Sequence, residues 1–176
     1  MKLNSEQRKA VSYHGSAVVT ACPGSGKTRV LIARVARGVS ELGSAKERVA
    51  ALTFTNRAAD EVRTRLDQEG ISKDCLWAGT IHSFALEWIL RPYSPYIDII
   101  QCGFTVADEY FCDTLLRDIR KQLGMGPYEK INTSYCRDGR IENVSDRQER
   151  AVEVYKEGLR DQKLIDYDEV LYLAYR

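Results

Sequence analysis

The sequence predicts an α/β protein built on a parallel sheet, because apolar runs of strand length alternate with amphipathic helical patterns. Strands are expected at residues 16–21, 48–54 and 75–80, and a helical pattern follows each of them. The runs are too apolar to alternate, as is typical of strands buried on both faces. In such proteins helices cover the sheet, and ligands bind at the carboxyl ends of the strands.

The predicted helices of the first ninety residues each present one apolar face. A short helix over residues 4–13 is expected to start at the N-cap Asn4, with Gln7 at its third position. In the helix after residue 28, apolar side chains should turn inward and basic ones outward, namely Val30, Leu31, Val35 and Val39, against Arg29, Arg34 and Arg37. The next helix spans residues 56–69 and ends at Gly70, and the one after residue 80 carries Ile81, Phe84, Ala85, Trp88 and Ile89.

From about Arg91 this alternation gives way to a mostly helical segment with its own small core. The expected order is a break at 92–96, at most a short strand at 104–106, a helix at 108–123, a loop at 124–142 and a helix around 152–159. Asp166 and Glu169 have the spacing of a capping box, which predicts the start of a last helix.

Composition and charge set few limits on function. The 176 residues carry a net charge of +1 at pH 7 and can hold one domain of ordinary size and part of another. Bases dominate the first forty residues and acids the part after residue 90; a basic start fits a polyanionic ligand, although solvated helix faces give the same pattern. Five cysteines without a C-x-x-C pair indicate reduced thiols, and we expect a cytoplasmic protein with neither a secretory signal nor a membrane span.

A run of small residues that ends in Gly-Lys-Thr lies between the first predicted strand and its helix. Such a run predicts a triphosphate-binding loop, whose members are Ala21, Cys22, Pro23, Gly24, Ser25, Gly26, Lys27 and Thr28. Backbone N–H groups of the loop and the positive end of the following helix would face the phosphates. Lys27 would reach the β and γ phosphates, and the Thr28 hydroxyl would ligate Mg²⁺.

Two residues of this loop need separate comment. Ala21 stands where the motif G-x-x-x-x-G-K-[ST] has its first glycine, and alanine is tolerable there if its φ stays negative. Cys22 is interpreted as a small residue that fills the loop, although a thiol near a helix N-terminus and Lys27 could be reactive. The plain alternative for the whole run is a glycine-rich turn.

Polar side chains follow the second and third predicted strands at their carboxyl ends. Phe54, Thr55, Asn56 and Arg57 follow the second strand, and the third ends in Thr80 before His82 and Ser83. Thr55 and Thr80 could equally be N-caps of the next helices. An aromatic ring, a hydroxyl, an amide and a cation at one strand end are suited to stack a base and hold a phosphate of single-stranded nucleic acid.

Four motifs occur together in one order, and their combination resembles the N-terminal part of UvrD/Rep-type superfamily 1 DNA helicases. These are residues 3–7 (Leu-Asn-Ser-Glu-Gln), 21–29, 52–59 (Leu-Thr-Phe-Thr-Asn-Arg-Ala-Ala) and 79–84 (Gly-Thr-Ile-His-Ser-Phe). The resemblance covers the whole chain. It implies a RecA-like P-loop NTPase sheet with a mostly helical insertion. The implied domains are the first part of the ATP-binding domain at 1–90, the insertion at 91–163 and the start of the return at 164–176.

The resemblance also implies roles for single residues. Gln7 matches a glutamine that reads adenine, although a helix-capping role is the alternative, and Arg29 matches a residue near the adenine. Lys27 and Thr28 match the catalytic phosphate and Mg²⁺ site. The motifs that contact single-stranded DNA match Phe54, Thr55, Asn56, Arg57, Thr80, His82 and Ser83.

The pair Asp108-Glu109 imitates the family's acidic motif, which holds Mg²⁺ and activates water. Its context is wrong, because that motif ends a buried strand of four or five apolar residues, whereas Phe104 to Ala107 is short and lies in the insertion. We interpret Asp108 as a helix cap. The acidic motif is therefore expected beyond Arg176.

We expect the ATP-binding portion of a helicase that couples ATP hydrolysis to movement on single-stranded DNA, 3′ to 5′, and to unwinding at a duplex junction. Its partners would be ATP, Mg²⁺, DNA and the remainder of the helicase chain. The fragment itself should bind ATP and hydrolyse almost none, because only Lys27 and Thr28 of the phosphoryl-transfer machinery are present. The alternatives are a free-standing nucleotide or nucleic-acid binding module and, less favoured, a small-molecule kinase.

Overall fold

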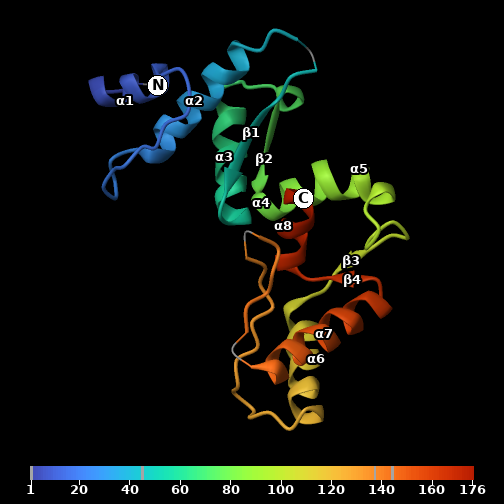
Figure 1. Cartoon of the computed structure of the whole chain (residues 1–176). Coiled ribbons are helices and arrows are strands. Elements are labelled where there is room, and N and C mark those ends of the chain that lie inside the picture. The colour runs from blue at the N-terminus through green and yellow to red at the C-terminus, as the bar shows by residue number, and fades with distance from the viewer. Residues whose placement is uncertain (1, 45, 137, 144) are drawn as a thin grey trace. The chain divides into compact units, whose positions relative to one another are not determined.

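The structure is a computed structural model that describes residues 2–44, 46–136, 138–143 and 145–176, and the chain forms two compact units (Figure 1). The first unit comprises residues 1–81 and the second residues 82–176. Helices and parallel strands occur in both, which confirms the α/β class. The domain limits suggested by the resemblance, at residues 90 and 163, stay a prediction.

The first unit is a two-stranded parallel sheet with helices packed around it. Its elements are α1 (Ser5–Ser12), α2 (Lys27–Ser40), β1 (Val49–Thr53), α3 (Asn56–Gln68), the 3-10 helix η1 (Lys73–Cys75) and β2 (Leu76–Thr80). Strand β1 pairs with β2 from Val49 opposite Leu76 to Thr53 opposite Thr80, so both carboxyl ends lie at one edge. The core is formed by Ile32, Val35, Ala51, Val62, Leu66 and Ala78.

Local capping signals set the ends of these helices as expected. Asn4 and Gln7 form a complete capping box at the start of α1, and the Thr55 hydroxyl accepts from the Ala58 N–H at the start of α3. Gly70 follows α3 with φ of +75°, a left-handed backbone that ends helices and favours glycine. The predicted ranges of these two helices are confirmed to within one or two residues.

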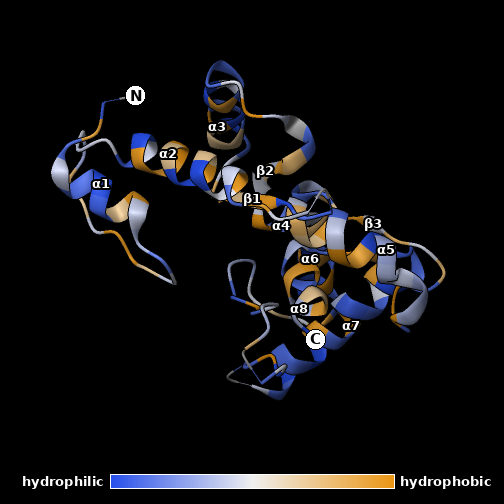
Figure 2. Ribbon diagram, turned by 90° about the horizontal axis from the view of Figure 1, so that it is seen from above, coloured by the Kyte–Doolittle hydropathy of each residue, from blue (hydrophilic) through white to orange (hydrophobic). Residues whose placement is uncertain are grey.

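Helix α2 is amphipathic, and Figure 2 shows orange and blue stretches alternating along its ribbon. Its buried residues are Ile32 and Val35. Leu31, predicted to face inward, is 37% exposed. The prediction was wrong because neighbouring helical positions are about 100° apart around the helix axis. Ile32 and Val35 lie at the centre of the buried face, and Leu31 lies at its edge.

The strand predicted at residues 16–21 is absent from the structure, where this segment carries no helix or strand and pairs with neither strand of the sheet. Val18 is 93% exposed and Val19 is 52% exposed, in place of the burial that was expected. A strand forms only where a neighbour satisfies its backbone N–H and C=O groups. Neither β1 nor β2 pairs with this segment, so its apolar, β-branched composition alone does not make it a strand.

The second unit is mostly helical. The polypeptide enters it through α4 (Ile81–Phe84), and its elements are the π-helical segment η2 (Ala85–Leu90), α5 (Arg91–Tyr93), the 3-10 helix η3 (Ser94–Tyr96), β3 (Thr105–Val106), α6 (Glu109–Gln122), α7 (Asp146–Asp161), β4 (Leu164–Ile165) and α8 (Tyr167–Tyr175). The short strand predicted near residue 104 is confirmed as β3, which pairs in parallel with β4. Residues 124–136, 138–143 and 145 carry no helix or strand, as predicted.

The predicted break at 92–96 is wrong, because helical turns continue through Pro92 to Tyr96. Before the proline the helix widens, and the Arg91 N–H donates to the Leu86 carbonyl in a π-type bond. A wider turn re-routes the backbone bonds where proline supplies no N–H. Two of the apolar residues expected on this helix, Ile81 and Trp88, are 51% and 44% exposed.

Two apolar clusters hold the second unit together. The first joins η2 to α8 and β4 through Ala85, Leu90, Ile100, Ile165, Val170 and Leu173. The second lies between α6 and α7 and contains Ala107, Ile119, Met125, Ala151, Tyr155 and Leu159. Asp108 caps α6, its carboxylate accepting from the Phe111 N–H at 2.7 Å, which confirms the interpretation of Asp108 as a helix cap.

Candidate functional site

The predicted phosphate loop runs into the N-terminus of α2, as a triphosphate-binding loop requires. Gly24 and Gly26 have φ of +77° and +87°, and a Cβ at Gly24 would meet nothing within 4 Å. The Lys27 ammonium donates to the carbonyls of Ala21 at 3.1 Å and Cys22 at 2.9 Å. Thr28 is half-buried in the first helical turn. The loop residues 21–25 are exposed.

These features fit a polyphosphate. An open, glycine-rich turn before a helix of 14 residues presents backbone N–H groups and a helix N-terminus to solvent. The two carbonyl contacts of Lys27 are exposed and fold its ammonium back onto the loop, so phosphate oxygens could replace them. In the first turn of α2, the Thr28 hydroxyl is the side-chain oxygen suited to ligate Mg²⁺.

Gln7 links α1 to the phosphate loop and also caps its own helix. Its Oε1 accepts from the Asn4 N–H at 3.0 Å, and its Nε2 donates to the Ser25 carbonyl at 2.9 Å. A Cβ added at Gly26 would lie 2.8 Å from this Nε2. The capping alternative is therefore correct in this structure, and the same side chain lies against the loop, where the resemblance places a base-reading residue.

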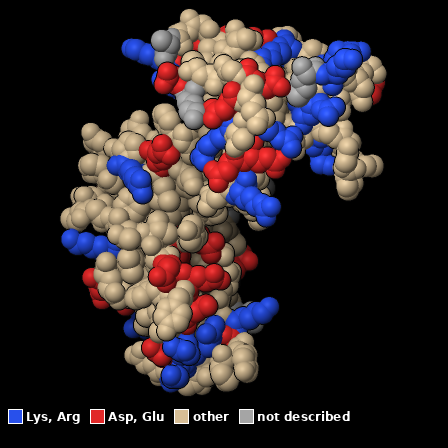
Figure 3. Space-filling view, turned by 180° about the vertical axis from the view of Figure 1, so that it is seen from behind, with Lys and Arg blue, Asp and Glu red and all other residues tan. Residues whose placement is uncertain are grey.

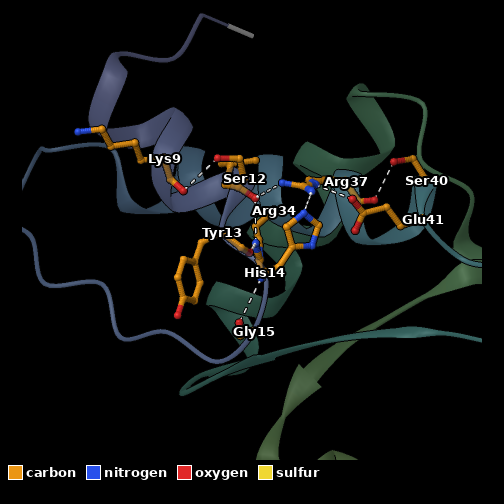
Figure 4. A network of polar contacts seen from close by, with 10 residues as sticks. Lys9, Ser12, Tyr13, His14, Gly15, Arg34, Arg37, Ser40 and Glu41 are labelled. Carbon is orange, nitrogen blue, oxygen red and sulfur yellow. Dashed lines mark hydrogen bonds and ion pairs between the residues drawn. The ribbon is translucent and has the colours of Figure 1, made fainter.

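Arg34 and Arg37 of α2 hold the segment that joins α1 to the loop (Figure 4). Arg37 donates to the Val11 carbonyl at 3.1 Å, and Arg34 donates to the same carbonyl at 2.9 Å and to that of Tyr13. These carbonyls lie at or after the last turn of α1, where backbone acceptors lack helical partners. Both arginines were predicted to face solvent, which is wrong: they are half-buried against α1.

A histidine and a carboxylate complete this network. Arg37 lies 2.8 Å from Nε2 of His14 and 2.6 Å from Oε1 of Glu41. The hydrogen bond from Arg37 holds the pKa of the Glu41 carboxyl below its usual value. Because guanidinium groups are donors only, Nε2 of His14 is the acceptor in this contact. Only the Arg37–Glu41 pair, with its i,i+4 spacing, can be read from the sequence, because the other partners of the two arginine side chains lie far away along the chain and most of them are backbone carbonyls.

The residues after β1 lie at the carboxyl edge of the sheet beside the end of β2. The Phe54 side chain is 99% exposed, although a large apolar ring gains free energy from burial. Asn56 and Arg57 are exposed in the first turn of α3, while Thr55 caps that helix. Thr80 ends β2 directly opposite Thr53. The sheet thus brings the residues after β1 and the end of β2 to one edge.

His82 and Ser83 belong to α4, at the start of the second unit. The His82 ring is half-buried and meets the ring of Tyr167, the first residue of α8, with centroids 5.2 Å apart and planes at 89°. This is an edge-to-face pair. No motif of the sequence points to Tyr167, because the two residues are far apart along the chain.

A buried charged cluster in the second unit was also missed. The Lys156 ammonium lies 2.9 Å from the Asp166 carboxylate and 3.8 Å from that of Glu169, and the three residues are 0–6% exposed. The Tyr135 hydroxyl donates to Glu169 at 3.1 Å. Burial, and then the Glu169 charge, raise the Tyr135 pKa above its usual value. The predicted capping box is half correct. Asp166 caps α8, but the Glu169 carboxylate accepts from the Tyr135 hydroxyl and lies near the Lys156 ammonium.

Comparison with known proteins identifies the family. The family model described as UvrD/REP helicase N-terminal domain matches residues 3–176, almost the whole chain. The chain belongs to this family. The resemblance inferred from the four motifs is thereby confirmed.

Individual members of the UvrD/REP family show the same similarity. An ATP-dependent DNA helicase PcrA from Leuconostoc citreum is 32% identical over 98% of this chain and 25% of its own length. The UvrD1 helicase of Mycobacterium bovis is 35% identical over 70% of this chain, and a PcrA of Staphylococcus epidermidis is 36% identical over 68%; each match covers 16% of the relative. The chain thus spans a quarter or less of these relatives.

The basic start of the sequence forms a basic surface on this UvrD/REP domain. Figure 3 shows blue Lys and Arg side chains gathered over α1 and α2, which flank the phosphate loop.

Among the residues with a described position, the structure shows no metal cluster, disulfide or membrane-spanning helix. In the part of the chain that the structure describes, no cluster of three His, Cys, Asp or Glu side chains could hold a metal ion, and all five cysteines are free. No helix among the described residues is long and apolar enough to cross a bilayer.

Proposed function

We propose that the chain is the ATP-binding portion of a DNA helicase that couples ATP hydrolysis to 3′ to 5′ movement along single-stranded DNA and to duplex unwinding. The observation that carries the proposal is the open loop at the start of α2, where the Lys27 ammonium donates to two exposed carbonyls, in a chain of the UvrD/REP family. Residues 1–90 would begin a RecA-like domain, 91–163 would form its helical insertion, and 164–176 would return to it.

ATP would bind with its phosphates over the loop. Lys27 would exchange the Ala21 and Cys22 carbonyls for phosphate oxygens, and the backbone from Gly24 to Thr28 would surround them. Gln7 and Arg29 would face the adenine, since Gln7 already lies against Ser25. Mg²⁺ would reach the site with the nucleotide, where it withdraws charge from phosphate oxygens, and the Thr28 hydroxyl would be its protein ligand.

Single-stranded DNA would bind to the residues that follow the strands. The exposed Phe54 ring would stack on a base, and Arg57 and Asn56 would contact phosphate. Thr55, Thr80, His82 and Ser83 complete the proposed set. The exposed aromatic ring supports this assignment, because its face at the end of a strand is free to stack on a base.

Nucleotide titration of the 176-residue chain tests the first half of the proposal. We expect Lys27→Met to raise the dissociation constant for a fluorescent ATP analogue with Mg²⁺ at least about tenfold, because charge-assisted hydrogen bonds to phosphate are lost. The control is Lys9→Met, which removes an exposed lysine of α1 that pairs with Glu6. Equal binding by wild type and Lys27→Met would refute the site.

Steady-state hydrolysis tests the remaining part. Phosphoryl transfer needs a metal-holding acid, a positioned water and cations on the developing charge, and the chain offers only Lys27 and Thr28. We therefore expect almost no ATP turnover, with or without single-stranded DNA. Robust DNA-stimulated ATPase activity of residues 1–176 would contradict this expectation.

A further inference from the structure

We propose that Tyr167 is a positioning residue for His82, so that the start of α8 acts in single-stranded DNA binding by holding the histidine ring in place. The inference rests on the proposed function, because it takes His82 as a DNA contact. It adds to that function a residue from a distant part of the sequence, which none of the four motifs contains.

The ring pair has the geometry of a specific contact. The centroids are 5.2 Å apart and the planes cross at 89°, which lets the positive edge of one ring meet the negative face of the other. Tyr167 remains 54% exposed, so it is not a core residue. An aromatic side chain that leaves half its surface in water while it contacts a candidate DNA residue is suited to fix that residue at the interface.

The Tyr167 backbone lies next to a buried anchor, the carboxylate of Asp166. Tyr167 directly follows Asp166, whose Oδ1 accepts from the Glu169 N–H at 2.7 Å as the N-cap of α8. The Oδ2 of the same carboxylate accepts from the Lys156 ammonium at 2.9 Å. Asp166 and Lys156 are 6% and 5% exposed. The first turn of α8 is therefore anchored by a buried ion pair, and this fixes the Cα from which the Tyr167 ring projects.

His82 is attached to the same core. It lies in α4, which continues directly into η2, and η2 packs on α8 through Ala85, Leu90, Val170 and Leu173. Both members of the ring pair belong to the second compact unit. Their relative position is consequently set by one apolar core and one buried ion pair.

Binding of a labelled sixteen-residue oligo-dT, followed by fluorescence anisotropy on the 176-residue chain, tests the inference. We expect Tyr167→Leu to raise the dissociation constant about fivefold, the size of a lost aromatic pair. Tyr167→Phe keeps the ring and should bind as wild type does. Tyr167→Gln, a second ring deletion, should match Tyr167→Leu. The matched control is Tyr175→Leu, at an 81% exposed tyrosine of the same helix.

Two further measurements distinguish a positioning role of Tyr167 from a role in protein stability alone. The ring of Tyr167 should shift the His82 ring-proton resonances, and that ring-current shift should persist in Tyr167→Phe and vanish in Tyr167→Leu. In a His82→Ala background, Tyr167→Leu should cause almost no further loss of DNA affinity, because the histidine that it positions is gone.

Three outcomes would overturn the inference. If Tyr167→Leu and His82→Ala weaken binding multiplicatively, Tyr167 contacts DNA independently and does not act through His82. If the ring deletions bind as wild type does while Phe54→Ala and His82→Ala lose affinity, the positioning role is wrong and the proposed function stands. If Phe54→Ala and His82→Ala both leave affinity unchanged, the proposed DNA site itself fails.

Discussion

Lys27 and Lys156 carry the same ammonium group in opposite surroundings. Lys27 lies at the surface of the first unit and donates to two loop carbonyls, which water could replace. Lys156 is 5% exposed in the second unit and lies among two carboxylates and the Tyr135 ring, whose centroid is 4.8 Å away. One lysine is available to a ligand, and the other is committed to the fold.

The difference lies in the cost of exchanging partners. An exposed ammonium loses little when it leaves a carbonyl, because water solvates it at once. A buried ammonium cannot leave its carboxylates without uncovering charge in a medium of low dielectric constant. Binding sites can therefore be built from the first arrangement, whereas the second fixes backbone positions such as the start of α8.

The largest expected effect comes from removing each ammonium in turn. Lys156→Met leaves Asp166 and Glu169 buried without their cation and should lower the free energy of unfolding by about 3–5 kcal/mol. Lys27→Met should lower it by less than about 1 kcal/mol. Urea denaturation of both variants measures the contrast. Equal losses of unfolding free energy in the two variants would show that burial does not make Lys156 more important for stability than Lys27.

Alkaline pH should destabilise the buried cluster around Lys156, because the Tyr135 hydroxyl of that cluster can lose its proton, whereas the exposed loop around Lys27 contains no tyrosine. Burial and Glu169 raise the Tyr135 pKa above its usual 10.0, so the folded state favours the neutral phenol. That contribution is fully present below pH 10 and is lost as pH rises further, because the unfolded chain then releases the proton first. The stability difference between wild type and Tyr135→Phe should narrow by about 1 kcal/mol from pH 9 to 11, after allowance for solvent screening.

Thermal or urea unfolding at several pH values measures this narrowing. Tyr128→Phe is the matched control, since Tyr128 is 94% exposed. Its difference from wild type should be small and independent of pH. A difference for Tyr135→Phe that stays constant up to pH 11 would show that the hydroxyl does not depend on its buried carboxylate partner.

The smallest expected effect is that bound ATP protects the Cys22 thiol of the exposed loop from alkylation. Cys22 is exposed beside Lys27, whereas burial raises the pKa of the half-buried Cys112 thiol and lowers its reactive thiolate fraction. Iodoacetamide should modify Cys22 faster than Cys112, and ATP with Mg²⁺ should slow modification of Cys22 severalfold. Cys102, which is also exposed, is the control for a general effect of nucleotide. Peptide mass spectrometry reads each site, and equal labelling of Cys22 with and without ATP would exclude its shielding.

Features governed by neighbouring residues were predictable from sequence. Asn4, Thr55, Asp108 and Asp166 each cap the helix that the sequence placed after them, and Gly70 ends α3. Caps and glycine turns depend on backbone groups within a few residues, so a local pattern contains the whole interaction. The phosphate-loop prediction rests on the same kind of local pattern.

Features that need a distant partner were not predictable. The apolar segment at 16–21 has the composition of a strand, but pairing decides whether a strand forms. Arg34 and Lys156 look like ordinary surface cations in sequence, and only tertiary structure brings carbonyls to one and carboxylates to the other. The contact of His82 with Tyr167 is of the same kind, because nothing near either residue indicates the other.

The contact between Gln7 and Gly26 limits which residues the loop can accept. Gly24 needs only a left-handed backbone and has free space, so asparagine or aspartate could replace it at modest cost. At Gly26 the left-handed backbone coincides with a Cβ position already taken by the Gln7 amide. A side chain at Gly26 would have to move the Gln7 amide, which is the far end of a flexible side chain, from its place against Ser25. Gly24 and Gly26, which are two positions apart in one loop, thus have unequal tolerance to mutation, and a shorter residue 7 would relax the restriction at Gly26.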